Sequence, residues 1–142
     1  MWTANYTVET SATATDVWNA LVALHSGIAL GPSSDKFELH GPFAVGTEVT
    51  VTPQGQDAMK SVIIELEPGL AYADQTAFGE LLLTFRHRLH STPTGGTTVT
   101  HTLEIAGNSS DQVGPELGPQ ISGDFPIAMA ELIAGAESGV CV

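Results

Sequence analysis

The chain has 142 residues and carries 16 Asp and Glu against 4 Lys and Arg, which gives a formal net charge of −12 at pH 7. This length suits one domain, and a hydrophobic content of 42% is enough to bury a core. Binding to a nucleic-acid backbone or to an anionic membrane surface requires clustered cations, so we expect neither as a partner.

The sequence also indicates in which cellular compartment we expect the protein. It has no apolar run close to the roughly 20 residues that span a bilayer. Its start, "MWTANYTVET", lacks the basic and apolar regions of a secretory signal. We therefore expect a soluble cytoplasmic protein. The single cysteine, Cys141, provides neither a disulfide framework nor a metal cluster, and we interpret it as incidental.

The first part of the chain predicts a strand followed by a helix. In "WTANYTVET", apolar and polar residues alternate with the period of two that is typical of a strand. In "SATATDVWNALVAL", Ser11 or Thr13 can cap a helix, and Val17, Leu21 and Leu24 follow at helical spacing. The next segment, "HSGIALGPSSDK", is rich in Gly, Ser and Pro and is a predicted loop.

Six further strands are predicted before the C-terminal segment. The period of two returns in "FELHGPF" and continues in "TEVTVTP". The segment "KSVIIELEPGLAYADQT" indicates two strands that are joined by a tight turn at Pro68-Gly69. The last two strands are "LLLTFRHRL" and "TTVTHTLEI", on either side of "STPTGG".

The C-terminal segment returns to a helical pattern. One stripe of a helix would hold its apolar residues, which are Ile121, Phe125, Met129, Leu132 and Ala136. Two arrangements are open: one long helix with a kink near Pro126, or a helix that begins at Asp124 as its cap. The order of elements indicates an α+β fold, in which a gap between helix and sheet would form an apolar cavity.

Four segments together resemble the START-like (SRPBCC) superfamily, and within it the polyketide cyclase/dehydrase-like branch. They are "YTVETSATATDVWNAL", "GPFAVGTEVTVTP", "LEPGLAYADQT" and "LTFRHRLHSTPTGGTTVTHTLEI". The resemblance implies a single START-like domain over residues 1–142 with a helix-grip fold. In this fold a curved seven-stranded antiparallel sheet wraps around a long C-terminal helix, and a short helical segment follows the first strand. A pocket for hydrophobic small molecules lies between sheet and helix.

The last hairpin carries the strongest candidate chemistry. Matching the apolar faces of its two strands sets His87 opposite His101 on the inward side. The same register pairs their apolar neighbours: Leu89 with Val99, and Phe85 with Leu103. Arg86 and Arg88 then point to the outer face, where Arg86 can approach Glu104.

The role of the two inward histidines is open between two interpretations. They could contact a ligand, or serve as catalytic acid–base groups in an aldol cyclisation. Alternatively, His87 and His101 could hydrogen-bond each other, a buried water or the Tyr72 hydroxyl. Two histidines without a third ligand do not make a zinc site, so we expect no metal and no cofactor.

Further residues are candidates for ligand contact. The alternation of the sequence leaves open whether Asp74 points inward, where a carboxylate would be functional, or outward as an ordinary surface charge. The predicted ligand-binding residues are Tyr72, Asp74, Leu83, Phe85, Leu103, Ile121, Phe125 and Met129.

These features favour the binding of a hydrophobic small molecule, with aromatic and polyketide-like compounds among the candidates. The alternative is a polyketide cyclase/dehydrase-type enzyme that uses His87 and His101 for acid–base chemistry. A third possibility is an interaction or stress-response module whose cavity is filled by side chains. The sequence contains no phosphate-binding glycine loop and no nucleophile elbow. We expect a monomer or a homodimer.

Overall fold

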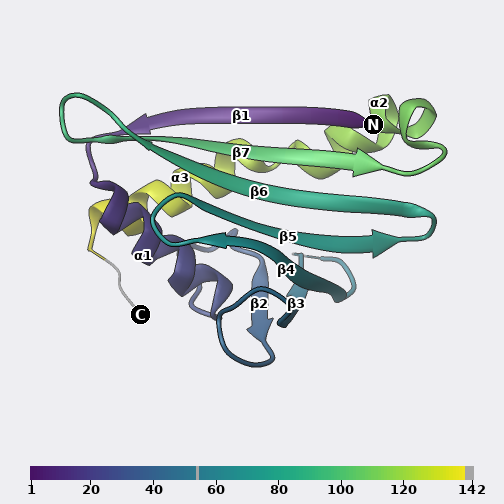
Figure 1. Ribbon diagram of the computed structural model, residues 1–142, viewed down its shortest axis with the longest axis horizontal. Helices are drawn as coiled ribbons and strands as arrows, with labels where there is room; N and C mark the ends of the chain where they lie inside the picture. The colour runs from purple at the N-terminus through teal and green to yellow at the C-terminus, as the bar shows by residue number, and fades with distance from the viewer. Residues whose placement is uncertain (54, 140–142) are drawn as a thin grey trace.

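The computed structural model describes residues 1–53 and 55–139, which form one sheet and three helices (Figure 1). Cys141 lies outside these residues. The strands are β1 (Trp2–Thr10), β2 (Lys36–Leu39), β3 (Glu48–Thr52), β4 (Met59–Glu67), β5 (Ala71–Phe78), β6 (Leu81–Ser91) and β7 (Thr97–Ala106). The helices are α1 (Ala14–His25), α2 (Ser110–Ser122) and α3 (Phe125–Glu137).

The sheet has the strand order β1-β7-β6-β5-β4-β3-β2, and every neighbouring pair is antiparallel. Strands β2 to β7 follow one another as a meander, while β1 closes the sheet by pairing with β7. Figure 1 shows α3 behind the sheet, where it packs against α1, and α2 lies against β1 and β7. This arrangement confirms the predicted seven-stranded helix-grip fold.

The register of the last hairpin follows from its alternating sequence. Along β7, buried and partly exposed residues alternate without interruption. A shift by one residue would expose this entire buried set, so the pairing is strongly specified. His87 lies opposite His101, and the flanking pairs are Leu89 with Val99 and Phe85 with Leu103. The predicted register is therefore confirmed.

The residues at the N-terminal ends of α1 and α3 explain where these helices begin. The Thr13 side chain accepts a hydrogen bond from the backbone N–H of Asp16 at 3.2 Å and so caps α1. The C-terminal segment is divided into two helices, and α3 begins at Phe125 with Asp124 at its N-cap position. Pro126 lies in the first turn, where its missing N–H disrupts no helical hydrogen bond. Of the two predicted arrangements, the one with a helix starting at Asp124 is confirmed.

Helix α2 approaches β1 very closely. A Cβ atom added at Gly118 would lie 2.1 Å from the indole of Trp2, and one added at Gly114 would lie 2.4 Å from the Trp2 Cβ. Glycine normally weakens a helix, but here only glycine leaves room for the Trp2 side chain. This contact packs α2 directly against Trp2 of β1.

None of the helices in the described part of the chain has the length and apolar character that crossing a bilayer requires.

Candidate ligand-binding site

A cavity of about 600 Å³ lies between the inner face of the sheet and the two C-terminal helices. Its wall is formed by residues of β2 to β7, by the end of α1 and the loop that follows it, by residues after β3, and by one face each of α2 and α3. This volume is in the usual range for small-molecule sites, about 300–1,000 Å³. More than half of the residues in the wall are apolar, and the polar ones come from strands β5 to β7, from the loops after α1 and β3, and from the helices.

The two histidines predicted on the inward side line this cavity as a stacked pair. The ring centroids of His87 and His101 are 3.9 Å apart, with 21° between the ring planes. On its other face, the His101 ring stacks on Phe125 of α3 at 3.8 Å. The three rings form a column that connects β6 and β7 to the start of α3.

Both histidines are buried and have an Nδ1 atom without a hydrogen-bond partner among the described residues. Burial lowers the pKa of His101 to about 3, and the nearby His25 acts in the same direction. The pKa of His87 is also well below its ordinary value, chiefly through burial and secondly through His101. Both rings are therefore neutral at pH 7. They contact each other through their faces, and no hydrogen bond joins their Nδ1 atoms.

A third histidine, His25, joins the group from the last turn of α1. Its ring centroid lies 4.2 Å from that of Tyr72 and 5.8 Å from that of His87. His25 Nδ1 is 2.8 Å from the carbonyl oxygen of Leu21, which can only accept, so Nδ1 carries the proton. Burial lowers the pKa of His25 to about 4, which makes this ring neutral too.

Asp74 faces the cavity, which resolves the orientation that the sequence left open. Its side chain is 4% exposed, and its Oδ2 accepts a hydrogen bond from the Tyr72 hydroxyl at 2.9 Å. Burial raises the pKa of Asp74 to about 7, while the Tyr72 hydrogen bond acts in the opposite direction. Burial and the nearby carboxylate raise the pKa of Tyr72 above its ordinary value. The cavity thus contains one carboxyl group that titrates near neutral pH.

The predicted ligand-binding residues fall into two sets. The cavity wall contains Asp74, Leu83, Phe85, Ile121 and Phe125, together with His87 and His101. The other three, Tyr72, Leu103 and Met129, are buried in the apolar core. Tyr72 still contacts the wall, because its hydroxyl hydrogen-bonds Asp74. Leu103 and Met129 support the wall by packing in the core.

His25 and Glu131 are among the wall residues that were not predicted from the sequence. His25 lies four residues after Leu21 on the buried face of α1, and this spacing was the available signal. Glu131 of α3 lines the cavity, and its Oε2 accepts a hydrogen bond from the backbone N–H of Ser33 at 3.1 Å. The contact between Ser33 and Glu131 joins residues 98 positions apart in the sequence, so no local sequence pattern indicates it.

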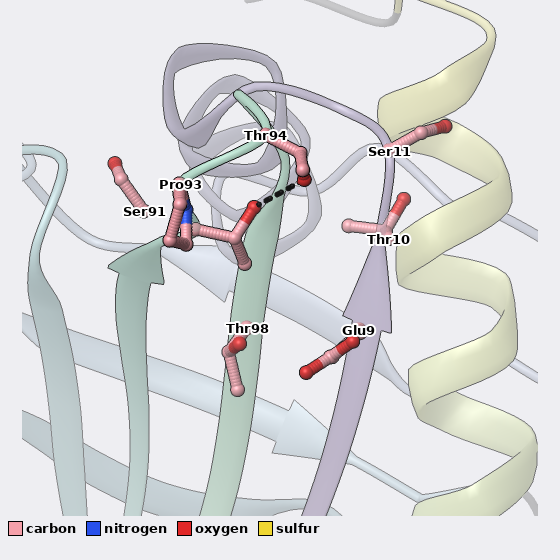
Figure 2. A pocket seen from close by; sticks show the side chains of 8 residues that line it. Glu9, Thr10, Ser11, Ser91, Pro93, Thr94 and Thr98 are labelled. Atoms are coloured by element: carbon pink, nitrogen blue, oxygen red, sulfur yellow. Dashed lines mark hydrogen bonds between the residues drawn. The ribbon is translucent and has the colours of Figure 1, made fainter.

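A second depression lies at the β6–β7 turn beside the end of β1 (Figure 2). Figure 2 shows mainly hydroxyl side chains around it. The hydroxyl oxygens of Thr92 and Thr94 are 3.2 Å apart and hydrogen-bonded to each other. Among the described residues, none of the buried side-chain atoms that lack a partner lines this depression. This depression is therefore a weaker candidate for a ligand-binding site than the internal cavity. No group of three metal-ligating side chains is found within residues 1–53 and 55–139.

Comparison with known proteins identifies relatives by structure alone. No family model matches the chain, and no curated protein matches it. Norcoclaurine synthase from Thalictrum flavum has a TM-score of 0.72 at 18% identity, covering 93% of this chain and 90% of its own. The Zhui aromatase/cyclase from Streptomyces sp. R1128 has a TM-score of 0.73 at 16% identity, covering 95% and 93%.

A third similar structure is Ara h 8.0201, with a TM-score of 0.72 at 16% identity and coverage of 96% of this chain and 97% of its own. These likenesses extend over nearly the whole chain. At such identities they show a common fold and leave the ligand open. The chain therefore shares the helix-grip fold of these structures, as its sequence predicts.

Proposed function

We propose that the protein binds a hydrophobic small molecule in the cavity between the sheet and the C-terminal helices. The observation that carries this proposal is the pair of buried Nδ1 atoms on His87 and His101, which line a largely apolar cavity without a partner. Buried polar atoms in folded proteins nearly always have a hydrogen-bond partner. A polar group on a bound molecule would supply one here.

The composition of the wall supports an aromatic ligand. Phe85 and Phe125 line the cavity together with the histidine pair, and Leu83 and Ile121 add aliphatic surface. Aromatic rings pack favourably against one another in offset or edge-to-face arrangements. One similar structure is named an aromatase/cyclase, which also supports a cyclic or aromatic class of ligand.

A neutral fluorescent ketone, 2-acetyl-6-(dimethylamino)naphthalene, tests this proposal. We expect saturable binding of one molecule per chain, with the emission shift of an apolar site. Ile121→Trp should abolish binding because its side chain lines the cavity. His101→Phe should weaken binding about 5- to 10-fold because it removes a hydrogen-bonding group.

The matched control is Leu82→Trp, because Leu82 is exposed on the sheet and does not line the cavity. It should bind the ketone as the unaltered protein does. Absence of saturable binding, or equal losses in Ile121→Trp and Leu82→Trp, would contradict the proposal. Circular dichroism of each variant separates loss of binding from loss of fold.

A second candidate function is acid–base catalysis of an aldol cyclisation on a polyketone. The observation in its favour is Asp74, whose pKa of about 7 suits a group that must both accept and release a proton near neutral pH. In such a reaction a base removes a proton from the carbon next to a carbonyl. The resulting carbanion attacks a second ketone, whose oxygen then takes up a proton. Neutral His87 or His101 would donate a hydrogen bond to that oxygen.

The enzyme hypothesis is tested with a synthetic tetraketide thioester and detection of the cyclised product by absorbance. Asp74→Asn should reduce the rate at least about 100-fold if Asp74 is the base. The control Glu67→Gln alters an exposed acid on β4 and should leave the rate unchanged. A cyclisation rate equal to that without protein, or one that Asp74→Asn and His101→Phe leave unchanged, would exclude this function and leave the binding proposal standing.

A further inference from the structure

The ionisable groups on the cavity wall have only one sign of charge. Four acidic residues line the cavity, namely Asp35, Asp74, Asp124 and Glu131. No lysine or arginine lines it, and all four basic side chains of the sequence belong to residues that the structure describes. A ligand anion would therefore meet carboxylates in a wall that contributes no lysine or arginine.

The four basic residues lie outside the cavity for identifiable reasons. Lys36 precedes Phe37, which lines the cavity, so the alternation of β2 turns Lys36 to the outer side. Lys60 is exposed on β4. On β6, Arg86 donates hydrogen bonds to Glu65 and Glu104 at 2.8 Å each, and Arg88 lies 3.5 Å from Glu65. These contacts hold the two arginines on the outer face of the sheet.

The histidines add no positive charge to the cavity wall, because burial keeps them neutral. His25 donates from Nδ1 to a carbonyl oxygen, so its Nε2 is left as an acceptor. His87 and His101 are each only 8% exposed, line the cavity and have Nδ1 atoms without a partner. These two atoms are evidence for a ligand that is independent of the acidic residues.

Asp74 is the acidic residue most deeply placed in this wall. Tyr72 pairs with His87 across β5 and β6, and His87 pairs with His101, so these three side chains form one row across the sheet. Asp74 lies two residues from Tyr72 on the same face, in the adjacent row with Phe85. A buried carboxylate is costly unless a cation compensates it, and Asp74 accepts its hydrogen bond from the neutral Tyr72 hydroxyl.

We propose that the ligand of this cavity carries a basic nitrogen: it is an arylalkylamine whose ammonium group pairs with Asp74 and whose ring lies against Phe85 and Phe125. This inference rests on the proposed binding function and specifies its chemical class. The aromatic rings add to the selectivity, because a cation over a ring face is attracted to it. Carboxylates of the same size are rejected by the acidic wall.

Three probes that share a naphthalene ring test the inference in the unaltered protein. They are 2-(2-naphthyl)ethylamine, 2-(2-naphthyl)ethanol and 2-naphthylacetate, which differ mainly in the charge of the terminal group. Calorimetric titration at pH 8 keeps the amine protonated, since a primary alkylamine has a pKa of about 10. We expect the amine to bind at least tenfold more tightly than the alcohol, and the carboxylate to bind most weakly.

Two variants then locate the charge. Asp74→Asn should reduce the affinity for the amine at least tenfold and change the affinity for the alcohol less than threefold. The matched control is Glu38→Gln, which removes the same formal charge from an exposed position on β2 and should leave the preference for the amine unchanged. The comparison of the three probes uses the unaltered protein, so it stands even if Asp74→Asn does not fold.

Each outcome separates this inference from the proposed function. If the alcohol or the carboxylate binds as tightly as the amine, the inference is wrong and the proposed function stands. If the amine is preferred equally in Asp74→Asn, Asp74 is not the counter-ion and the assignment is overturned. If none of the three probes binds, the inference fails together with the proposed site for aromatic ligands.

Discussion

The imidazoles of His87 and His101 stack across neighbouring strands, with ring centroids 3.9 Å apart and an angle of 21° between the planes. Two rings at this distance cannot both carry a charge at low cost, and burial disfavours a charge on either one. The pair therefore remains neutral at pH 7 and offers its nitrogens to the cavity as hydrogen-bonding groups. This combination of stacking and unmet hydrogen bonding leads to the first prediction.

His101→Phe should increase the free energy of unfolding at pH 7 by about 1 kcal/mol, because it removes a buried polar atom that lacks a partner. The aromatic stack on Phe125 is kept. Urea denaturation measures the change. His90→Phe is the control, because His90 is exposed on the same hairpin and should change stability little. A loss of stability in His101→Phe beyond that in the control would show that His101 Nδ1 has a stabilising partner.

The unfolding free energy should decrease as the pH falls from 6.5 towards 4. In this window the unfolded chain protonates His25, His87 and His101, whereas the folded protein keeps them neutral, since their pKa values are lowered by burial. Each histidine then favours unfolding by up to about tenfold in the equilibrium constant per pH unit. Denaturation at pH 4.5, 5.5 and 6.5 measures the slope.

Asp74 contributes in the opposite direction throughout this range. Its pKa is about 7 in the folded protein against 3.8 ordinarily, so it stabilises the fold at low pH and loses this contribution as the pH rises through 7. Three histidines outweigh one carboxyl group below pH 6.5. His101→Phe should therefore have a shallower slope, and an unchanged slope would contradict neutral burial of His101.

Tyr72→Phe should raise the pKa of Asp74 further above 7, because the Tyr72 hydroxyl favours the ionised carboxylate. Tight binding of 2-(2-naphthyl)ethylamine requires the ionised form, so its onset should move to higher pH in this variant. Three other titratable residues lie near Tyr72: His25 contacts its ring, and His87 and His101 follow it in the same row across the sheet. All three histidines are neutral throughout this range.

Calorimetric titration of the amine between pH 5.5 and 8.5 measures that shift. Tyr6→Phe is the control, because Tyr6 lies on β1 and does not hydrogen-bond Asp74 in the described structure. An onset at the same or a lower pH in Tyr72→Phe would show that the hydroxyl does not stabilise the carboxylate.

Gly118→Ala should decrease the free energy of unfolding by about 2 kcal/mol, because its Cβ would overlap the Trp2 indole. Helix propensity alone predicts the opposite sign, a gain of about 1 kcal/mol. Thermal or urea denaturation distinguishes the two. Gln112→Ala at an exposed position of α2 is the control. In a background with Trp2→Leu, Gly118→Ala should regain most of the loss, and failure to do so would place the strain elsewhere.

Alternation in the sequence was sufficient to predict the strands and the hairpin register. On β6 and β7 one face is largely apolar, so only one register brings the two apolar faces together on the buried side, and the opposition of His87 and His101 follows. The orientation of Asp74 could not be predicted in this way. On β5, Ala71, Tyr72, Ala73 and Asp74 are all buried, so the local sequence has no polar face to indicate a direction.

The remaining parts of the site depend on contacts between distant segments. His25 was assigned to a loop because Gly and Ser follow it, although α1 extends to this residue and turns its ring towards Tyr72. The contact between Glu131 and Ser33 forms only when the loop after α1 folds back over α3. No periodicity within either segment encodes such a contact, so the acidic character of the wall became visible only in three dimensions.

The close packing of Trp2 on α2 gives the protein an intrinsic optical reporter. The chain has only two tryptophans, and the indole of Trp2 lies directly against the backbone at Gly118. The same helix presents Leu117 and Ile121 to the cavity, on either side of that glycine along the chain. A molecule entering the cavity that displaces α2 would alter the surroundings of the indole, and so its fluorescence, without any label attached to the protein.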